Sequence, residues 1–483
     1  MEGTRQALKT KAGWVAVFLG ILILGVTLGK GWDRTVLATE TYEELKTFTE
    51  VLAHVQKHYV EDVKTKDLVY GAIRGMLSTL DPHSAFMPPE VYKEVQVETK
   101  GEFGGVGIQI GMKDNRLTVI APIDGTPAER AGVKAGDFVI KVNEESTKNM
   151  TLMDAVQKMR GLKGTKVTLT IQREGVGEPI VFGLVREVIK IESVRSKMLD
   201  GNIGYVRLTQ FQDQSSKDVA NAVRKLREQK MQSLILDLRN NPGGLLNSAV
   251  EVSEQFVGLN RLIVYIKTRA GKKDDFASHI KEPPDDYPVI VLVNEGSASA
   301  SEIVAGALQD WGRAVVVGVQ TFGKGSVQTI LPLGDGSGLR LTTAKYYTPK
   351  GRSIHGVGIT PDILVKGKPS ATPPVRERDL DKTLREPGRE GAPPHPEGQP
   401  ESQPAPKPES KDGKKDKEAG KDKETKEKEA DDPQLQKAVE LLKSWIIFKD
   451  LRTVKQDDRV ERADVKKRQE TVRRGLIGPK PAL

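Results

Sequence analysis

A serine in a small-residue turn and a lysine in a glycine-flanked turn are the residues that could do chemistry together. The apolar run Val289–Val293 predicts a buried strand, and a helical pattern extends from about Ser301 to Trp311. Ser299 lies between them, at a strand-to-helix turn where backbone N–H groups point outward and can hold an anion. Lys324 follows in the glycine-flanked turn. Serine needs a base to become a nucleophile, and a desolvated, neutral lysine can be that base.

A purely structural interpretation of the same residues is open. Ser299 and Glu302 have the Ser-x-x-Glu spacing of a capping box, in which the serine only begins a helix. Lys324 could equally be a solvated loop lysine. Spacing alone does not decide between these interpretations.

Four segments together resemble the carboxyl-terminal processing proteases, also called tail-specific proteases. The resemblance covers about residues 42–365, in the order that the family shows, and rests on Asp237–Gly244, Gly296–Glu302, Thr321–Gly325 and Tyr346–Gly356. It implies that Ser299 is the nucleophile and Lys324 the base. It also implies that Gln328, one helical turn further on, supports the lysine.

The oxyanion hole is expected at two turns of an α/β core. A buried strand, Leu234–Leu238, leads into a turn, and such turns at strand ends are where α/β sheets place ligands. A glycine amide there and the Ala300 amide can stabilise an oxyanion. The family resemblance points to the pair Gly243 and Gly244, and both stay open as the donor.

Histidine is the alternative base, and two histidines were considered. His83 follows Pro82 in a turn and is interpreted as a turn residue whose ring bonds to local backbone. His355 lies in the segment Arg352–Gly356, shortly before Asp362. Both His355 and Asp362 are interpreted as structural, because the family works without histidine.

Residues 99–186 resemble a PDZ domain. Short strands alternate with glycine turns, and a helix is expected at Leu152–Met159. A PDZ domain binds an extended C-terminus as an added strand and holds its carboxylate on backbone amides. Val106, Gly107 and Ile108 occupy the matching loop. Arg173 is the candidate for coupling tail binding to activity, with an ordinary edge-strand charge as the alternative.

The N-terminal residues predict export. Arg5, Lys9 and Lys11 precede Ala12–Gly29, an uncharged run that as a helix would span about 27 Å, close to the hydrocarbon core of a bilayer. Basic residues before such a run favour an N-in, C-out orientation. An uncleaved anchor is favoured over a cleaved signal peptide. Either places the protein in the cell envelope, anchored in the inner membrane facing the periplasm or secreted to the periplasm.

Composition narrows the class of protein. The chain has 483 residues, no cysteine and six histidines, so a thiol nucleophile and thiolate zinc are excluded. The histidines include no His-Glu-x-x-His motif, and no metal or other cofactor is expected. Its net charge is +9, and residues 434–483 carry 13 Lys or Arg against 7 Asp or Glu. Basic residues are not interleaved with aromatic ones, so no nucleic-acid partner is expected.

The domain organisation follows from these patterns. We expect a multidomain α/β protein in which an α/β serine-protease core, implied by the resemblance to be of the ClpP/crotonase-like type, follows the PDZ domain. The expected parts are an anchor or signal (1–30), a helical region (41–98), the PDZ domain (99–186), the protease core (187–365), a disordered linker (366–433), and a C-terminal helix with a basic tail (434–483).

The expected function is a serine endopeptidase with a Ser-Lys dyad. Its expected partners are protein substrates with apolar C-termini, the membrane through the N-terminal segment, and a second copy or an adaptor protein. Two alternatives remain open: a PDZ scaffold with a degenerate protease core, and a lipid or retinoid carrier of the related non-enzymatic fold.

Overall fold

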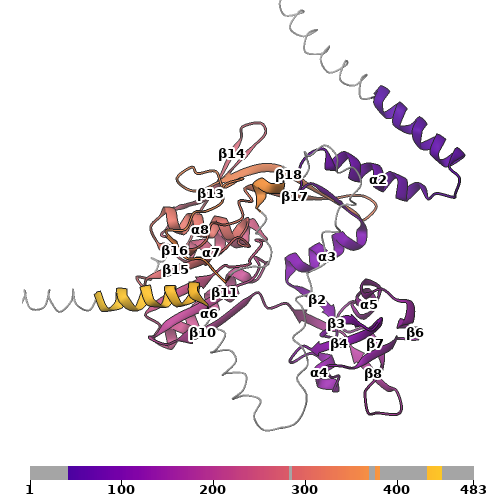
Figure 1. Cartoon of the computed structure of the whole chain (residues 1–483), viewed down its shortest axis with the longest axis horizontal. Helices are drawn as coiled ribbons and strands as arrows, with labels where there is room; N and C mark the ends of the chain where they lie inside the picture. The colour runs from indigo at the N-terminus through magenta and orange to yellow at the C-terminus, as the bar shows by residue number, and fades with distance from the viewer. Residues whose placement is uncertain (1–41, 282–284, 369–375, 381–431, 449–483) are drawn as a thin grey trace, which may run out of the picture. The chain divides into compact units, whose positions relative to one another are not determined.

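The computed structural model describes residues 42–281, 285–368, 376–380 and 432–448 (Figure 1). The chain divides into two compact units, Met1–Leu80 and Asp81–Leu483. No helix in the described part is long and apolar enough to cross a membrane. The predicted anchor or signal lies outside the described residues, as does the basic tail after 448, so both stay predictions.

The described part of the first unit is helical, as its apolar period predicts. A helix covers 42–58, and α2 covers Thr65–Ser78. Leu45, Phe48 and Val51 recur on one face of the first helix and are 44–58% exposed. These side chains therefore lack a packed partner within the described chain.

The chain from Asp81 onward belongs to the second unit, which corrects the predicted extent of the helical region. After the turn at Pro82 it forms a short strand, β1 (Ala85–Met87), and then α3 (Pro89–Lys100). Proline at the first position of α3 and Gly101 (φ 71°) after its end mark the boundaries. Strand β1 pairs with β18 (Gly338–Tyr347), far along the chain, and local periodicity does not reveal such a pairing.

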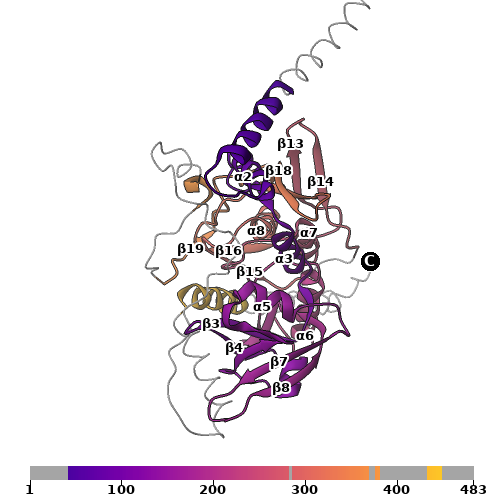
Figure 2. The ribbon, with the colours of Figure 1, turned by 90° about the vertical axis from the view of Figure 1, so that its right-hand side faces the viewer.

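The PDZ domain is an antiparallel sheet with one main helix, α5 (Leu152–Met159) (Figure 2). The strand order is β3-β4-β5-β7-β8, with β6 beside β5, and β3 lies at an edge. The other elements are β2 (Glu102–Gly105), β3 (Ile108–Lys113), β4 (Arg116–Pro122), α4 (Pro127–Ala131), β5 (Phe138–Val142), β6 (Glu145–Ser146), η1 (Thr147–Asn149), β7 (Lys166–Gln172), β8 (Ile180–Val185) and β9 (Glu187–Lys190). Strands β2 and β9 pair separately with each other.

The protease core is built on a six-stranded sheet of order β10-β11-β12-β15-β16-β19. All neighbours are parallel except β10, which is antiparallel to β11. The strands are β10 (Val194–Leu199), β11 (Ile203–Leu208), β12 (Ser233–Asp237), β15 (Val289–Val293), β16 (Ala314–Gly318) and β19 (Ile363–Leu364). The strand predicted at Val289–Val293 is confirmed with its boundaries, and the one predicted at Leu234–Leu238 is confirmed one residue earlier, at Ser233–Asp237.

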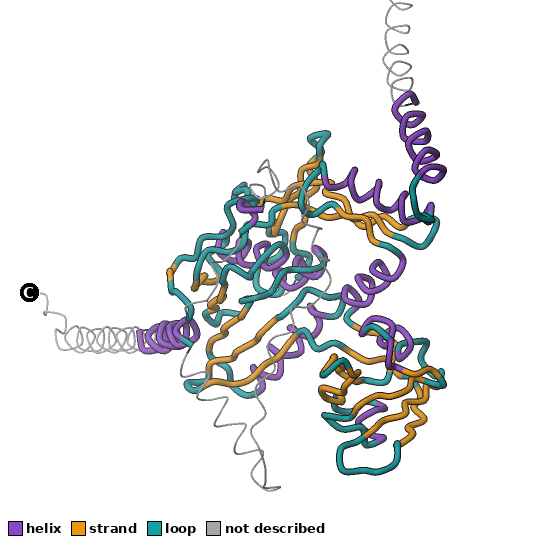
Figure 3. Tube along the Cα trace, turned by 45° about the vertical axis from the view of Figure 1, so that its right-hand side comes forward, coloured by secondary structure: helices purple, strands orange, loops and turns teal. Residues whose placement is uncertain are grey.

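Helices cover both faces of this sheet (Figure 3). Helices α6 (Ser215–Glu228), α7 (Leu246–Glu254) and α8 (Ala300–Asp310) share one apolar cluster with Leu234 and Val291. The alternate strand residues form a second cluster with the predicted C-terminal helix, which covers 433–448. Both faces of the strands are therefore apolar, as in other parallel sheets.

A second core sheet pairs β1, β18, β13 and β14, with β17 also on β18. Its remaining strands are β13 (Leu262–Thr268), β14 (Lys273–Ala277) and β17 (Ser326–Pro332). Residues 377–380 form a helical turn within the segment predicted to be disordered, and Glu377 is buried there. The prediction of disorder was wrong for these residues. Composition alone cannot reveal that a single carboxylate is buried by contacts with residues far away in the sequence. Most of that segment lies outside the described residues.

Candidate functional site

Ser299 sits at the sharp turn between β15 and α8, as predicted. It occupies the N-cap position of α8 with φ 54° and ψ −112°, a conformation that costs a non-glycine residue about 1–3 kcal/mol. The capping interpretation is correct for position, since the Ser299 N–H donates to Oε2 of Glu302 at 2.8 Å. Such backbone strain persists only where surrounding contacts enforce it.

The three serines of the turn differ in their surroundings. Ser297 and Ser301 are fully buried, and their hydroxyls donate to the carbonyls of Leu238 and Asn241, each at 2.8 Å. Ser299 is partly exposed and lines a pocket of about 320 Å³. Of the three serines, Ser299 is therefore the one available to a substrate.

Glu302 connects the serine turn to the lysine turn. Its carboxylate is fully buried and accepts hydrogen bonds from the Ser299 N–H, the Thr321 hydroxyl at 2.5 Å, the Gly323 N–H at 2.8 Å and the Lys324 N–H at 2.9 Å. Sequence reasoning treated Glu302 only as a capping residue. Its spacing to Ser299 was visible, but the contact with the lysine turn depends on the fold.

The environment of Glu302 sets its ionisation. Burial is the largest influence and raises the pKa of Glu302 to about 7, although the four donated hydrogen bonds act in the opposite direction. The group therefore titrates close to neutral pH.

The pocket beside Ser299 brings together most of the predicted site. Lys324, Gln328, Ala300 and Gly244 line it along with Ser299. The remaining lining residues that sequence reasoning did not assign include Val95, Glu98, Phe211, Leu245, Ile303 and Arg340. The mixture of apolar walls and a few polar groups is typical of a site that holds a peptide side chain beside reacting groups.

Gln328 lies on a strand rather than one helical turn after Lys324, which corrects that description of its place. It belongs to β17, and its amide nitrogen donates to the Thr342 hydroxyl at 2.8 Å. Its Oε1 is buried and has no hydrogen-bond partner in the described part of the chain. A buried amide oxygen without a partner is available to accept a hydrogen bond.

The two glycines of the predicted oxyanion turn are not equivalent. The Gly243 N–H donates to Oδ1 of Asn241 at 2.9 Å and is thereby engaged. A Cβ added at Gly243 (φ 107°) would lie 2.8 Å from the Ser299 Cβ, so only glycine fits this close approach. Gly244 lines the pocket with Ala300. The geometry favours Gly244 over Gly243 as the donor.

Tyr346 packs in the core beside the site. It is 2% exposed and belongs to the main apolar cluster, but it also lines the pocket. Burial raises its pKa well above the usual value, and the neighbouring Glu302 acts in the same direction. Tyr346 is therefore a neutral phenol next to Ser299.

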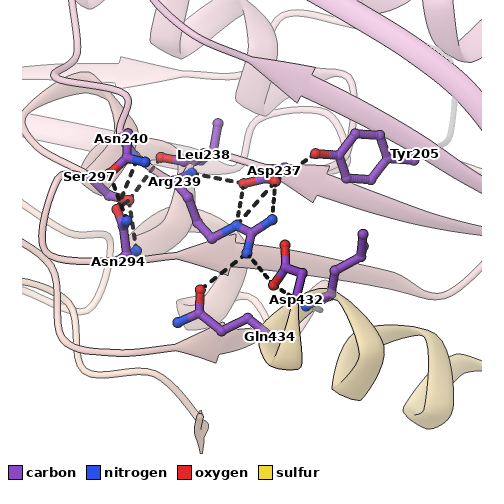
Figure 4. Close-up of polar contacts among 10 residues, drawn as sticks. Tyr205, Asp237, Leu238, Arg239, Asn240, Asn294, Ser297, Asp432 and Gln434 are labelled. Atoms are coloured by element: carbon purple, nitrogen blue, oxygen red, sulfur yellow. Dashed lines mark hydrogen bonds and ion pairs between the residues drawn. The ribbon is translucent and has the colours of Figure 1, made fainter. Parts of the chain in front are cut away.

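An ion-pair network fixes the turn that carries the glycines (Figure 4). Asp237, fully buried, accepts from the Tyr205 hydroxyl at 2.7 Å and from the Arg239 guanidinium at 2.7–3.1 Å. Arg239 also donates to Asp432 at 2.8 Å and to Gln434 at 3.2 Å. Burial is the largest single influence and acts to raise the pKa of Asp432, but Arg239 together with backbone N–H groups of Leu435 and Gln434 lowers it. The start of the C-terminal helix is thus tied to this turn.

The histidines lie outside the pocket. His83 Nε2 hydrogen-bonds the carboxylate of Glu377 at 2.8 Å, so the predicted bond to local backbone is wrong. His355 Nδ1 lies 3.8 Å from Glu377. Asp362 is structural, as predicted, since Oδ2 accepts from the Val316 N–H at 2.8 Å. Among the described residues, no group of three or more His, Asp and Glu side chains is arranged to hold a metal ion.

The predicted tail-binding loop precedes the edge strand of the PDZ sheet. Val106 is buried, Gly107 has φ 77°, and Ile108 begins β3. A Cβ at Gly107 would lie 2.3 Å from Thr126, so glycine is needed where the loop packs. Strand β3 contacts α5, and its edge position leaves room for an added strand.

Arg173 makes contacts within the PDZ domain. Its guanidinium donates to both carboxylate oxygens of Asp137, at 2.7 and 2.9 Å, and to the Gly132 carbonyl at 2.9 Å. Burial is the largest single influence and acts to raise the pKa of Asp137, but hydrogen bonds from Arg173 and the Lys134 N–H, with the charges of both residues, together lower it. Arg173 is therefore more than an ordinary edge charge, and its predicted regulatory role stays a prediction.

Family models match three consecutive parts of the chain. Peptidase family S41 matches residues 202–365, PDZ domain matches 94–172, and "Activating protease CtpB N-terminal domain" matches 31–91. A serine at a strand-to-helix turn, a pocket and a PDZ domain thus occur in one chain. This combination defines a serine-type peptidase of family S41 with a PDZ domain.

Similarity to characterised relatives narrows the class of peptidase further. A carboxy-terminal-processing protease of Bartonella bacilliformis is 46% identical over 353 residues, covering 72% of this chain and 80% of the relative. A carboxyl-terminal-processing protease of Synechocystis is 42% identical, covering 64% and 74%. A solved photosystem II D1 C-terminal processing protease has 30% identity and a TM-score of 0.39, with 66% of this chain and 92% of that one covered. The chain belongs to the carboxy-terminal processing proteases.

Replacing Glu302 by glutamine should lower peptide cleavage on the order of 10²-fold, because one amide oxygen cannot accept all four hydrogen bonds that hold Ser299 and Lys324. The measurement is kcat/KM on a peptide substrate. Glu251→Gln, an exposed change on α7, is the matched control. Equal activity of Glu302→Gln and wild type would refute the positioning role.

Glu302 should also make stability depend on pH. Its pKa is raised from 4.5 to about 7, so its stabilising contribution is fully present below about 4.5 and is lost as the pH rises through about 7. Across that window the free energy of unfolding of wild type should fall relative to Glu302→Gln. Denaturant titrations at pH 5 and pH 8 check the sign.

Proposed function

We propose that this peptidase cleaves protein substrates with a Ser-Lys dyad formed by Ser299 and Lys324. One observation supports this proposal more than any other. Ser299 and Lys324 line the same pocket, and their backbone N–H groups donate to the same buried carboxylate, that of Glu302. His83 and His355, the alternative bases, do not line that pocket. A lysine that is desolvated when substrate fills the pocket is a suitable base for serine.

The chemistry assigns one role to each pocket residue. The Ser299 hydroxyl attacks the peptide carbonyl while Lys324 takes its proton, and Oε1 of Gln328 accepts a hydrogen bond from the lysine amine. The oxyanion receives hydrogen bonds from the Gly244 and Ala300 amides. Lys324 then protonates the leaving amine, and a water that it activates releases the acyl-enzyme.

Substrates are recognised by their C-terminal tails. The PDZ domain supports this because such domains bind peptide C-termini by strand addition, and β3 is an edge strand next to the loop at Val106, Gly107 and Ile108. An apolar terminal residue is expected, and Arg173 is the candidate for coupling its binding to activity.

We further infer that the protein acts in the cell envelope, anchored or secreted through Ala12–Gly29, and that its core is of the ClpP/crotonase-like type. The uncharged run after Arg5, Lys9 and Lys11 supports the location. The parallel sheet with a serine at a strand end supports the fold type. The exposed apolar side chains of helix 42–58 leave a second copy or an adaptor as an expected partner.

Ser299→Ala and Lys324→Ala should each lower kcat by at least roughly three orders of magnitude with the fold intact, because nucleophile and base act as a unit. Cleavage of an unfolded protein substrate, with circular dichroism as the fold check, tests this. Ser297→Ala and Ser301→Ala are the controls and should retain turnover per folded molecule at reduced stability. An inactive Ser297 or Ser301 variant beside an active Ser299→Ala would move the nucleophile elsewhere.

A peptide with a free apolar C-terminus should be cleaved with a kcat/KM at least about tenfold higher than its amidated form. The loop at Gly107 has to hold a carboxylate, and an amide removes that charge. Both peptides carry the same scissile sequence, so the active site itself provides the control. Equal cleavage would exclude tail recognition by the PDZ domain while leaving the dyad untouched.

The full chain expressed in a bacterium with an envelope should fractionate with the membrane and resist a carbonate wash, and deletion of residues 12–29 should leave it in the cytoplasm. Mass spectrometry of the N-terminus separates an uncleaved anchor from a cleaved signal. Full-length protein found in the cytoplasmic fraction after spheroplasting would rule out export.

A further inference from the structure

A buried carboxylate lies behind the lysine turn, on a segment beyond the residues that the peptidase model matches. Glu377 is 5% exposed, and the family model ends at 365. The described residues 376–380 are a short loop and helical turn. A carboxylate is costly to bury unless hydrogen bonds and charged neighbours compensate it, so its position points to a specific role.

Two histidines from distant parts of the chain surround this carboxylate. His83, 9% exposed and 294 positions earlier, has Nε2 at 2.8 Å from both oxygens of Glu377. His355 has Nδ1 at 3.8 Å. The Nδ1 atom of His355 is buried and has no hydrogen-bond partner among the described residues.

The segment is bonded directly to the lysine turn. The Glu377 N–H donates to the Phe322 carbonyl at 3.2 Å, and the Arg376 guanidinium donates to Oε1 of Gln320 at 3.1 Å. On its other side the turn bonds through Thr321 and Gly323 to Glu302. The turn that presents Lys324 is thus held between the carboxylate of Glu302 and the backbone of the segment that carries Glu377.

The other side of the lysine turn packs on the loop that carries His355. A Cβ added at Gly325 would lie 2.3 Å from the His355 backbone nitrogen, so the two backbones are in direct contact. The Gly356 N–H donates to the Gly323 carbonyl at 2.9 Å. A displacement of His355 would therefore be transmitted to the residues on both sides of Lys324.

A second route leads from Glu377 to Gln328. The His83 N–H donates to Oδ1 of Asp81 at 2.8 Å, and the same oxygen accepts from the Thr342 hydroxyl at 3.0 Å. Thr342 in turn accepts from the amide of Gln328 at 2.8 Å. The anchor on His83 therefore reaches the side chain that supports the base.

We propose that Glu377 is a positioning residue for catalysis: its carboxylate fixes residues 376–380 and His83 behind the lysine turn, and so holds Lys324 and Gln328 in place. The inference rests on the proposed dyad. Glu377 does not line the pocket and so acts through its neighbours. A shift of about 1 Å in a reacting group can cost on the order of 10²-fold in rate, so such an anchor matters for turnover.

The test compares Glu377→Ala, Glu377→Gln and Arg378→Ala in the full chain, with kcat and KM measured on a peptide that has a free apolar C-terminus. Glu377→Ala should lower kcat by at least about tenfold with KM within about twofold of wild type. Glu377→Gln keeps one acceptor for His83, and its kcat loss should be smaller. Arg378 is 61% exposed in the same segment, so Arg378→Ala should match wild type.

Thermal midpoints and tail-peptide binding by the PDZ domain measure the folded fraction in every variant. A purely structural role would lower the midpoint without separating kcat from KM. A folded Glu377→Ala with wild-type kcat, or with a loss confined to KM, would overturn the inference. If Glu377→Ala does not fold, Glu377→Gln decides: a kcat reduced several-fold at unchanged KM supports the anchor, and a wild-type kcat overturns it.

Ser299→Ala in the same assay separates this inference from the proposed function. Cleavage that survives Ser299→Ala would defeat the dyad itself. Cleavage abolished by Ser299→Ala but unaffected by Glu377→Ala would defeat only the anchor.

Discussion

The buried carboxylate of Glu302 is the interaction on which the site depends. It accepts hydrogen bonds from the backbone of Ser299 on one side and from Gly323 and Lys324 on the other. Ser299 has a backbone conformation that is unfavourable by about 1–3 kcal/mol, so it needs such an enforcing contact. Because burial raises the pKa of Glu302 to about 7, the link between the two turns is sensitive to conditions near neutrality.

The parallel sheet explains why the other parts of the site meet. Strands β12 and β15 are neighbours in register, with Asp237 opposite Leu292, so the turns that follow them leave the same edge of the sheet. Asn240 and Asn294 then pair across these turns at 2.7–2.8 Å. This places Gly243 against Ser299 so closely that a side chain would not fit. The close approach of Gly243 to Ser299 is thus a consequence of strand order.

Segments outside the matched peptidase region complete the core. Asp432 and Gln434, at the start of the helix 433–448, bind Arg239, which in turn pairs with the buried Asp237. Removing one member of such a buried group leaves another charge without compensation, which is more costly than never having formed the group. Removing Glu377 would in the same way take away the carboxylate that hydrogen-bonds the Nε2 atom of His83. The long insertion before residue 432 therefore does not prevent the C-terminal helix from packing on the sheet.

The amino-acid sequence by itself determined many of the elements, the family, and which residues are proposed to react. Apolar runs and periods located strands such as Val289–Val293 and the helix Leu152–Met159 at their observed boundaries, because these signals are local. The motifs around Ser299 and Lys324 sufficed to identify the family. Only the tertiary structure decided what lies between them: the contact of Glu302 with the lysine turn, the place of Gly244 in the pocket lining, Gln328 on a strand, and the Glu377–His83 contact across 294 positions. A buried polar contact between distant residues leaves no periodic trace in the chain, since it depends on how strands and turns are brought together.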